Sequence, residues 1–322
     1  MKYRYLGSTG LKVSEIGFGG WGIGGNNNNS KGYGPTNNQE SIVALKTAFE
    51  KGINFYDTSP LYGLGQSEKL IGQTFKSNRD KVIIVTKVGY TDYLGNQNFS
   101  LKYIRESLEQ SLKRLQTDYV DIFQLHDLPI ELIYKSPDIM NTLLDLKKEG
   151  KIRFLGISTK NQEESKKIIE NKNFKCMQIN FNLLDQRAIK NGLFKKCKNN
   201  KVGIIGRTPL CFGFLTGKYN AKSFFHEDDH RSRWSKKQIE LWSTAYTLFL
   251  NNLRNKDKQN NPQISLRFCL SFSEISTVIP GMLNKSHVVE NAISSDLGKY
   301  PIETINKFHE IYNKNSFFIK KL

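Results

Sequence analysis

The chain has 322 residues, of which 48 are Lys or Arg and 30 are Asp or Glu, so its formal net charge is +18. A hydrophobic fraction of 38% is enough to bury a large core, which excludes an intrinsically disordered chain. No apolar run approaches the roughly 18 residues of a membrane span, and the N-terminal residues lack the apolar stretch of a signal peptide. The four cysteines form no CxxC motif and no disulfide framework. We therefore expect a reduced, cytoplasmic α/β protein that binds no membrane.

The positive charge would suit a nucleic-acid partner if it were concentrated on one face. The lysines, however, are spread over nearly every segment, among many asparagines. We interpret the charge as a solvated surface that helps to draw in an anionic cofactor, and we expect no nucleic-acid partner. Tight, salt-sensitive binding of DNA or RNA would be the mark of the alternative.

The first residues predict a β-hairpin, with extended segments Lys2–Leu6 and Lys12–Glu15 joined by a glycine-containing turn. Short apolar runs follow, which are rich in β-branched and aromatic residues and do not alternate, as is typical of strands buried on both faces. These runs are Ile16–Gly19, Asn54–Asp57, Val82–Lys87, Val120–Leu125, Phe154–Ser158, Cys176–Ile179, Val202–Gly206 and Thr277–Ile279.

Segments with the spacing of amphipathic helices lie between these runs. They are Gln39–Lys51, Leu101–Leu115, Asn141–Lys148, Glu163–Glu170, Ala188–Asn199, Pro262–Phe272 and Val288–Ser295. This alternation predicts one (β/α)8 TIM barrel domain over residues 1–322. An open, doubly wound sheet with a second domain is the alternative, but no linker or change of composition divides the chain.

Residues from Thr208 to Asn261 interrupt the alternation after the seventh predicted strand. They contain a polar, charged loop, Lys218–Arg233, and an extra amphipathic helix, Lys236–Leu253. This pattern predicts a long insertion on the face of the barrel where ligands bind. A last helix, Ile302–Tyr312, is expected outside the barrel.

Three successive predicted strands are closed by ionisable residues, namely Asp57, Lys87 and His126, and Tyr62 follows in the loop after Asp57. These side chains are expected to converge, because the active site of such a barrel forms at the C-terminal ends of its strands. A lysine ammonium would lower the pKa of a neighbouring tyrosine, an aspartate would keep the lysine charged, and a histidine would donate a hydrogen bond to a carbonyl. Each residue alone has an ordinary structural explanation, but the set predicts a catalytic site.

Two short motifs match other enzyme classes. Gly17–Gly22 has the spacing GxGxxG of dinucleotide-binding folds, but no helix is predicted after it, so we interpret it as the first loop of the barrel. His226–His230 has the spacing HExxH of zinc proteases, but its flanks lack a helical stripe. We predict no metal site there and interpret the segment as part of a loop that covers cofactor or substrate.

The chain resembles the aldo-keto reductase family, in the form of a bacterial-type member, over nearly its whole length. The motifs that carry the resemblance are LGSTGLKVS at 6–14, GINFYDTS at 52–59, YG at 62–63, VTK at 85–87, DIFQLH at 121–126, GIS at 156–158, LTGKY at 215–219, IPG at 279–281 and EN at 290–291. The resemblance implies NAD(P)H-dependent reduction of a small aldehyde or ketone. Hydride would come from the nicotinamide C4 and a proton from Tyr62, while Lys87 and Asp57 would tune Tyr62 and His126 would orient the carbonyl.

The resemblance also implies where the cofactor binds, with Ser158 and Gln178 at the nicotinamide carboxamide. Arg207 replaces an aromatic residue that stacks on the nicotinamide in many members, and Leu283 replaces a polar residue that holds the 2′-phosphate. The loss of the polar residue at Leu283 weakens the preference for NADP(H). We still favour NADP(H), with Lys285 or His287 in place of that residue, and do not exclude NAD(H). The full set of expected cofactor-binding residues is Gly20, Trp21, Asp57, Ser158, Gln178, Arg207, Thr208, Pro209, Leu210, Lys218, Gly281, Leu283, Lys285, His287, Glu290 and Asn291.

A regulatory subunit that senses the cofactor on the same barrel, as the potassium-channel β-subunits of the family are thought to do, is the alternative function. The intact set of Asp57, Tyr62, Lys87 and His126 favours catalysis. The sequence identifies neither the physiological substrate nor the pathway, and it leaves open a monomer or a homo-oligomer.

Overall fold

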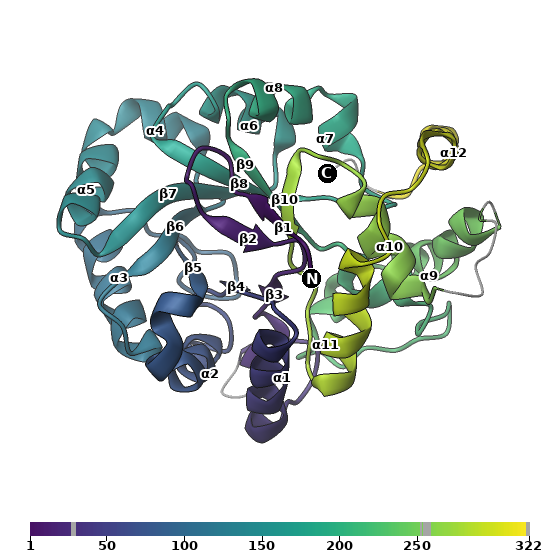
Figure 1. The fold of residues 1–322 in the computed structure, drawn as a ribbon, viewed down its shortest axis with the longest axis horizontal. Coiled ribbons are helices and arrows are strands. Elements are labelled where there is room, and N and C mark those ends of the chain that lie inside the picture. Colours follow the sequence, from purple (N-terminus) through teal and green to yellow (C-terminus); the bar gives the residue numbers. More distant parts are fainter. Residues whose placement is uncertain (27–29, 252, 254–258, 320–322) are drawn as a thin grey trace.

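The computed structural model describes residues 1–26, 30–251, 253 and 259–319. An eight-stranded parallel sheet runs in chain order from β3 to β10 (Figure 1). Every predicted apolar run overlaps one of its strands, which confirms the α/β fold. The strands are β3 (Phe18–Gly19), β4 (Phe55–Asp57), β5 (Ile83–Val88), β6 (Val120–His126), β7 (Ile152–Thr159), β8 (Phe174–Asn180), β9 (Gly203–Arg207) and β10 (Ile275–Val278).

The first and last strands of this sheet meet. Ile16 bridges to Val278 and Gly19 bridges to Gly281, and the Gly17 N–H donates a 2.8 Å hydrogen bond to the Val278 carbonyl. The sheet therefore curls round until its two edges are joined, as in a barrel. Because all eight strands are parallel, their carboxyl ends lie together at one end of the curled sheet.

Helices lie around the outside of the sheet (Figure 1). The predicted helix Ala188–Asn199 is divided into two, because Gly192 adopts a left-handed φ of +78°. The α-helices are α1 (Asn38–Glu50), α2 (Gln66–Phe75), α3 (Leu101–Leu115), α4 (Ile130–Lys135), α5 (Pro137–Lys148), α6 (Gln162–Ile168), α7 (Arg187–Lys190), α8 (Leu193–Asn199), α9 (Lys236–Leu250), α10 (Asn261–Leu270), α11 (Lys285–Ala292) and α12 (Ile302–Lys314). Short 3-10 helices are η1 (Gly22–Gly24), η2 (Lys76–Lys81), η3 (Cys211–Thr216), η4 (His230–Arg233) and η6 (Ile293–Ser295).

Helix α2 was not predicted, and its sequence shows why. It contains Gly72, a residue that disfavours helix. In the structure a Cβ at this position would lie 2.6 Å from the Arg114 carbonyl oxygen at the end of α3. The glycine therefore allows two helices to approach closely, which is a tertiary requirement that the local pattern does not contain.

The predicted hairpin is present as β1 (Tyr3–Tyr5) and β2 (Lys12–Ser14), and it closes the amino-terminal end of the sheet. Leu6, Leu11 and Val13 are buried in one apolar cluster with strand residues Phe55, Ile83, Val85, Ile122, Cys176, Ile205 and Ile279. The turn passes close to β9, since a Cβ on Gly7 would lie 2.4 Å from the Gly203 nitrogen. The hairpin therefore fills the interior of the curled sheet at its amino-terminal end with apolar side chains.

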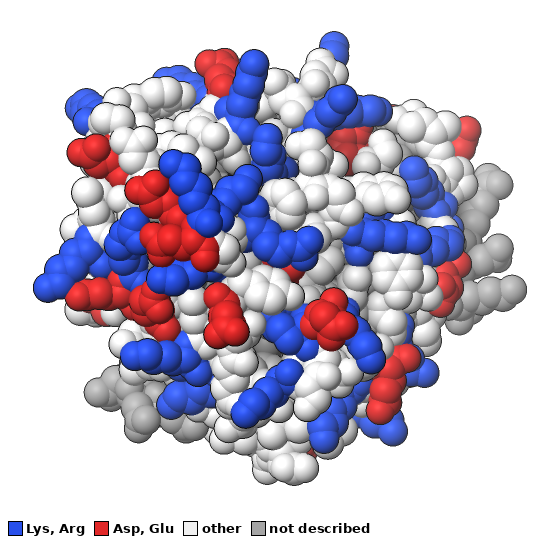
Figure 2. All heavy atoms as spheres, turned by 60° about the vertical axis from the view of Figure 1, so that its left-hand side comes forward, with Lys and Arg blue, Asp and Glu red and all other residues white. Residues whose placement is uncertain are grey.

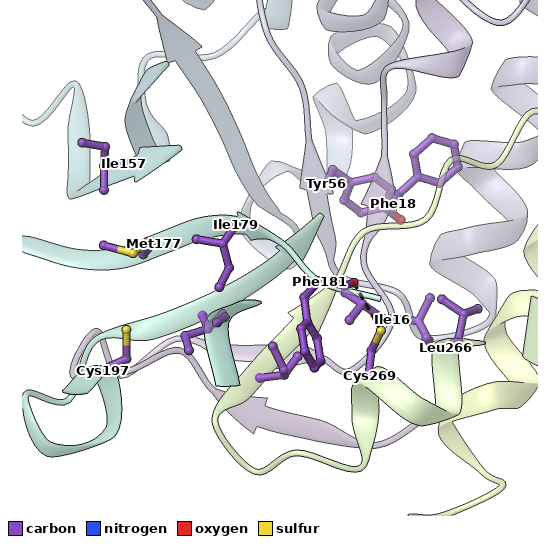
Figure 3. Packing of buried hydrophobic residues seen from close by; sticks show 14 of the residues in the cluster. Ile16, Phe18, Tyr56, Ile157, Met177, Ile179, Phe181, Cys197, Leu266 and Cys269 are labelled. Carbon is purple, nitrogen blue, oxygen red and sulfur yellow. Dashed lines mark hydrogen bonds between the residues drawn. The ribbon is translucent and has the colours of Figure 1, made fainter. Parts of the chain in front are cut away.

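A larger apolar cluster lies between the sheet and the helices. In Figure 3, Ile16 and Phe181 lie beside Cys269 of α10. The Phe181 ring stacks on Phe268 with centroids 5.4 Å apart. This packing fixes α10 against the strands that end at the site described below.

The segment between β9 and α10 carries η3, η4 and α9. Trp242 of α9 is fully buried and stacks on Phe212 with ring centroids 5.7 Å apart. Its indole N–H donates a 2.7 Å hydrogen bond to the Phe317 carbonyl. Helix α9 is therefore fixed both to the loop after β9 and to the segment after α12.

Basic and acidic side chains are interspersed over the face shown in Figure 2. Exposed ion pairs such as Arg105 with Glu149, 2.7 Å apart, show the same mixing of charge. Of the helices in the described ranges, none is both long enough and apolar enough to cross a membrane.

Candidate active site

A cavity of about 1320 Å³ opens at the carboxyl ends of the parallel strands. Asp57 at the end of β4, His126 at the end of β6 and Gln178 in β8 lie in its wall. The cavity also reaches Glu290 and Asn291 in α11. Residues from distant parts of the chain thus meet in one long pocket, as the order of the strand ends predicted.

Lys87 is the centre of the polar cluster at the floor of this cavity. Its ammonium donates to both carboxylate oxygens of Asp57 (2.7 and 2.8 Å), to the Thr58 carbonyl (2.8 Å) and to the Tyr62 hydroxyl (3.2 Å). The Lys87 side chain is completely buried, and Asp57 is 2% exposed. Burial lowers the pKa of Lys87, and the ion pair with Asp57 opposes this effect. A buried lysine with this set of acceptors holds its charge in one fixed place.

Tyr62 is positioned by the turn that follows β4. Gly63 in this turn adopts φ +62°, and the Gly24 carbonyl lies where a Cβ on Gly63 would stand. The Tyr62 ring packs edge-on against Trp21, with centroids 5.0 Å apart. Both contacts fix the hydroxyl above Lys87.

The acidity of Tyr62 differs from the sequence-based expectation of a lowered pKa. Burial raises the pKa of the Tyr62 phenol well above its usual value, and the Asp57 carboxylate raises it further, while Arg207 lowers it. The phenol therefore holds its proton at neutral pH in this pocket. Lys87 still provides the positive charge that a phenolate at this position would contact.

His126 closes β6 beside the same cavity. Its ring packs edge-on against Tyr90, with centroids 4.8 Å apart. Burial lowers the pKa of His126 to about 3, with Asp127 opposing and Lys87 adding to the effect. The imidazole is therefore neutral near pH 7, and a neutral imidazole N–H can donate a hydrogen bond to a carbonyl oxygen.

The glycine-rich segment after β3 forms a loop and not a dinucleotide-binding turn. It leads into η1, and α1 begins only at Asn38. The Gly20 N–H donates a 2.8 Å hydrogen bond to the Asp57 carbonyl, and a Cβ on Gly20 would lie 2.6 Å from the Ser67 hydroxyl. Gly20 is therefore required for close packing beside Asp57 and does not line the cavity.

Several buried polar atoms around the cavity have no hydrogen-bond partner within the described residues. They include Trp21 Nε1, Ser158 Oγ, Gln162 Oε1 and Arg207 Nε. Gln178, by contrast, donates a 2.6 Å hydrogen bond to Asp57. Orphaned donors and acceptors of this kind mark a surface that a polar ligand completes. A nicotinamide carboxamide, which carries both donors and an acceptor, matches this set chemically.

Most of the expected cofactor-binding residues lie along the wall of the same cavity. Lys285 is exposed and lies outside this wall, and Ser158 is buried behind it. Leu283 brings an apolar side chain into the wall, and the His287 ring nitrogen accepts a 3.4 Å hydrogen bond from the Leu283 N–H. The expected residues that line the cavity are Trp21, Asp57, Gln178, Arg207, Thr208, Pro209, Leu210, Lys218, Gly281, Leu283, His287, Glu290 and Asn291.

Asp127 is a site residue that the sequence reasoning missed. It adopts φ +56°, and its carboxylate contacts Lys160 at 3.0 Å, Arg207 at 3.6 Å and the Tyr90 hydroxyl at 3.0 Å. These contacts join the ends of β5, β6, β7 and β9 around His126. Its position directly after His126 was the only signal for it in the sequence.

The HExxH segment does not form one helical face. His226 is exposed and contacts Asp228 at 2.7 Å, whereas the His230 ring packs edge-on against Trp21 with centroids 5.1 Å apart. The His230 N–H donates a 2.8 Å hydrogen bond to the Gly32 carbonyl. The segment therefore joins the first loop to the loop after β9. Over the described part of the chain, we find no group of three or more His, Cys, Asp or Glu side chains that could hold a metal ion.

Comparisons with known proteins agree with this geometry. Residues 15–313 match the model of the Aldo/keto reductase family. Aldo-keto reductase YhdN of Bacillus subtilis (strain 168) is 36% identical over 238 residues, which cover 72% of this chain and 69% of that protein. The NADH-specific methylglyoxal reductase of Escherichia coli (strain K12) is 32% identical over 319 residues, which cover 92% and 94%. The holo structure of aldo-keto reductase AKR11C1 from Bacillus halodurans is 26% identical with a TM-score of 0.77, and the match covers 97% of this chain and 96% of that one.

Proposed function

Because this chain belongs to the aldo/keto reductase family, we propose that the cluster around Lys87 is the catalytic centre of a carbonyl reductase. The chain is an NAD(P)H-dependent oxidoreductase that reduces an aldehyde or ketone to an alcohol. The observation that carries the proposal is the buried ammonium of Lys87, held by Asp57 and within 3.2 Å of the Tyr62 hydroxyl.

The residues divide the proton chemistry among them. Tyr62 holds its proton at neutral pH and donates it to the oxygen of the carbonyl as that oxygen gains negative charge. Lys87 then faces the phenolate that remains, and Asp57 keeps the ammonium in place. His126, neutral at this pH, donates a hydrogen bond to the same carbonyl oxygen and so fixes its orientation.

A reduced nicotinamide, when bound, supplies the hydride for this reaction. The Ser158 hydroxyl, which is buried without a partner among the described residues, supports a carboxamide at this end of the cavity, and Gln178 pairs with Ser158 on the neighbouring strand. Lys218 is exposed in the cavity wall and provides a positive charge for a phosphate group. We infer that NADP(H) is preferred, as is usual in the family, and that NAD(H) is also accepted, since Leu283 is apolar and Lys285 lies outside the wall.

We further infer that residues 1–322 form one (β/α)8 domain and that the segment after β9 is an insertion that covers the cofactor. Its contact with the first loop, from His230 to Gly32, supports this role. We place the enzyme in the cytoplasm, acting on a small carbonyl compound. A regulatory subunit, the alternative considered above, has no support from the two relatives described above, which are both named as reductases.

The substitution Tyr62→Phe tests the proposal, because it removes the proton donor and keeps the ring. We expect kcat for a model aldehyde to fall about 100- to 10,000-fold, the usual contribution of a general acid. The dissociation constant of NADPH, measured by fluorescence titration, should stay close to that of the wild type. A variant that keeps near-wild-type kcat would show that Tyr62 is not the acid.

A further inference from the structure

Two basic side chains at the mouth of the cavity are uncommitted. Lys31 and Arg233 are exposed and line the cavity, and neither side chain has a hydrogen-bond or ion-pair partner within residues 1–26, 30–251, 253 and 259–319. Lys160, their neighbour in the wall, is engaged by the Tyr90 hydroxyl at 2.6 Å and by Asp127 at 3.0 Å. The cavity wall therefore contains two positive charges that no described residue pairs with.

Arg231 and Arg233 differ sharply, although only one residue separates them. Arg231 is buried, and its guanidinium contacts the carboxylate of Asp229 at 2.6 Å and the hydroxyl of Tyr219. The guanidinium of Arg233 instead lies over the Trp234 ring, 4.5 Å from its centroid, and makes no polar contact with the described residues. Arg231 thus holds the loop in place, whereas Arg233 presents a fixed guanidinium to the cavity.

Arg233 faces the catalytic side of the cavity. The guanidinium of Arg233 lies 5.9 Å from the centroid of the Phe212 ring, and the Phe212 and His230 rings lie 5.7 Å apart, centroid to centroid. The His230 ring packs on Trp21, which packs on the Tyr62 ring. An anion at Arg233 would therefore lie on the same side as the reacting carbonyl.

We propose that Arg233, with Lys31 in the same cavity wall, binds a carboxylate or phosphate group of the substrate, so that the enzyme selects anionic aldehydes or ketones. The inference rests on the proposed function, because an anion held here serves the reaction only if Tyr62 and His126 receive the carbonyl. A planar guanidinium suits both anions, since its parallel N–H groups donate to two oxygens at once. The ring of Trp234 fixes the plane of that guanidinium before the substrate arrives.

The test compares para-carboxybenzaldehyde with its neutral methyl ester as substrates of the wild type and of Arg233→Gln. The two aldehydes differ in charge and share the same ring, so the ratio of their kcat/KM values measures recognition of the anion. In the wild type we expect a preference for the carboxylate of about 10- to 100-fold, the range of a charge-assisted hydrogen bond. Arg233→Gln should bring the ratio towards one, Arg233→Lys should keep part of it, and added salt should reduce it in the wild type.

Lys222→Gln is the matched control, because Lys222 is exposed on the same loop and lies outside the cavity wall. This variant loses one positive charge and should leave the ratio unchanged. A wild-type ratio near one, with the ester reduced in a Tyr62-dependent manner, overturns the inference and leaves the proposed function intact. Failure of the wild type to reduce any aldehyde contradicts the proposed function itself. If Arg233→Gln weakens NADPH binding in a fluorescence titration and leaves the ratio unchanged, Arg233 serves a cofactor phosphate and the inference is wrong.

Discussion

The two ends of the curled sheet are built from the same strands and carry opposite kinds of side chain. At the amino-terminal end, Leu6, Leu11 and Val13 of the hairpin fill the interior with apolar groups. At the carboxyl end, the strands are followed by charged and polar residues such as Asp57 and His126. The difference agrees with a division in which one end mainly stabilises the fold and the other carries the proposed active site, as is typical of (β/α)8 barrels.

Two arginines show the contrast in detail. Arg4, below the sheet, contacts Glu15 at 2.7 Å and donates to the carbonyls of Leu270 (2.6 Å), Phe272 (2.7 Å) and Ile275 (2.7 Å). Arg207, at the other end, donates one hydrogen bond of 3.2 Å to Thr159, and its Nε is buried without a partner among the described residues. A guanidinium whose N–H groups donate to protein acceptors stabilises the segments that it joins. A guanidinium with a buried, unpaired N–H can still donate a hydrogen bond to a ligand.

The largest effect that would test the contrast is expected for Lys87→Met. Loss of the ammonium removes the charge beside Tyr62, and we expect kcat to fall about 100- to 10,000-fold. It also leaves Asp57 buried without its cation, so the free energy of unfolding should fall by about 3–5 kcal/mol. Lys151→Met is the control, because Lys151 pairs with exposed acids and should cost less than about 1 kcal/mol. Steady-state kinetics and urea denaturation measure both effects; a Lys87→Met enzyme with normal kcat would contradict the assignment.

Arg4→Met probes the opposite end. It leaves the Glu15 carboxylate without its cation and three carbonyls without their donor, so the free energy of unfolding should fall by about 3–5 kcal/mol. The kcat of the folded enzyme should stay close to that of the wild type, since no catalytic side chain contacts Arg4. Urea denaturation and kinetics on the same preparation decide the matter. A kcat that fell with little loss of stability would mean that the two ends are coupled.

A pair of glycine substitutions sharpens the comparison at smaller cost. In the hairpin, Gly7→Ala places a methyl group 2.4 Å from the Gly203 nitrogen, at a residue whose φ is +53°. This variant should lower the free energy of unfolding by about 1–3 kcal/mol and leave kcat unchanged. At the other end, Gly20→Ala places a methyl group 2.7 Å from the Asp57 carbonyl oxygen. This variant should lower kcat/KM about tenfold or more, because Asp57 has to shift. Equal effects of both variants on kcat would argue against the separation of stability and catalysis between the two ends of the sheet.

The last test is a pH dependence to which two buried histidines of the catalytic end contribute. Burial lowers the pKa of His126 and His230 to about 3, whereas both groups titrate near 6.5 in the unfolded chain. Below about pH 6.5 these histidines bind protons in the unfolded state and stay neutral in the folded state. The free energy of unfolding is therefore highest above that pH and falls as the pH falls towards 3. The expected slope is about 1.4 kcal/mol per pH unit for each histidine. Urea denaturation between about pH 7 and pH 5 should show a shallower slope for His230→Gln than for the wild type, and equal slopes would contradict the burial of His230.

The sequence by itself determined the strands of the sheet, most of its helices and which strand ends carry the residues that we propose as catalytic. Runs of β-branched and aromatic residues identify a strand buried on both faces, because that signal lies within a few neighbouring residues. The strand ends then placed Asp57, Lys87 and His126 in one group, since parallel strands of one sheet end on the same side.

Only the tertiary structure decided the environment of these groups. Helix α2 depends on the contact of Gly72 with the end of α3, and the raised pKa of Tyr62 depends on the burial of its phenol. The guanidinium of Arg233 has no carboxylate partner among the described residues, because Asp229 pairs with Arg231. Burial and the choice of partner are properties of all the residues that surround a group, and those residues come from distant parts of the chain. Local spacing therefore predicts which side chains reach the site, and the packed fold determines the charge and the contacts that each of them has there.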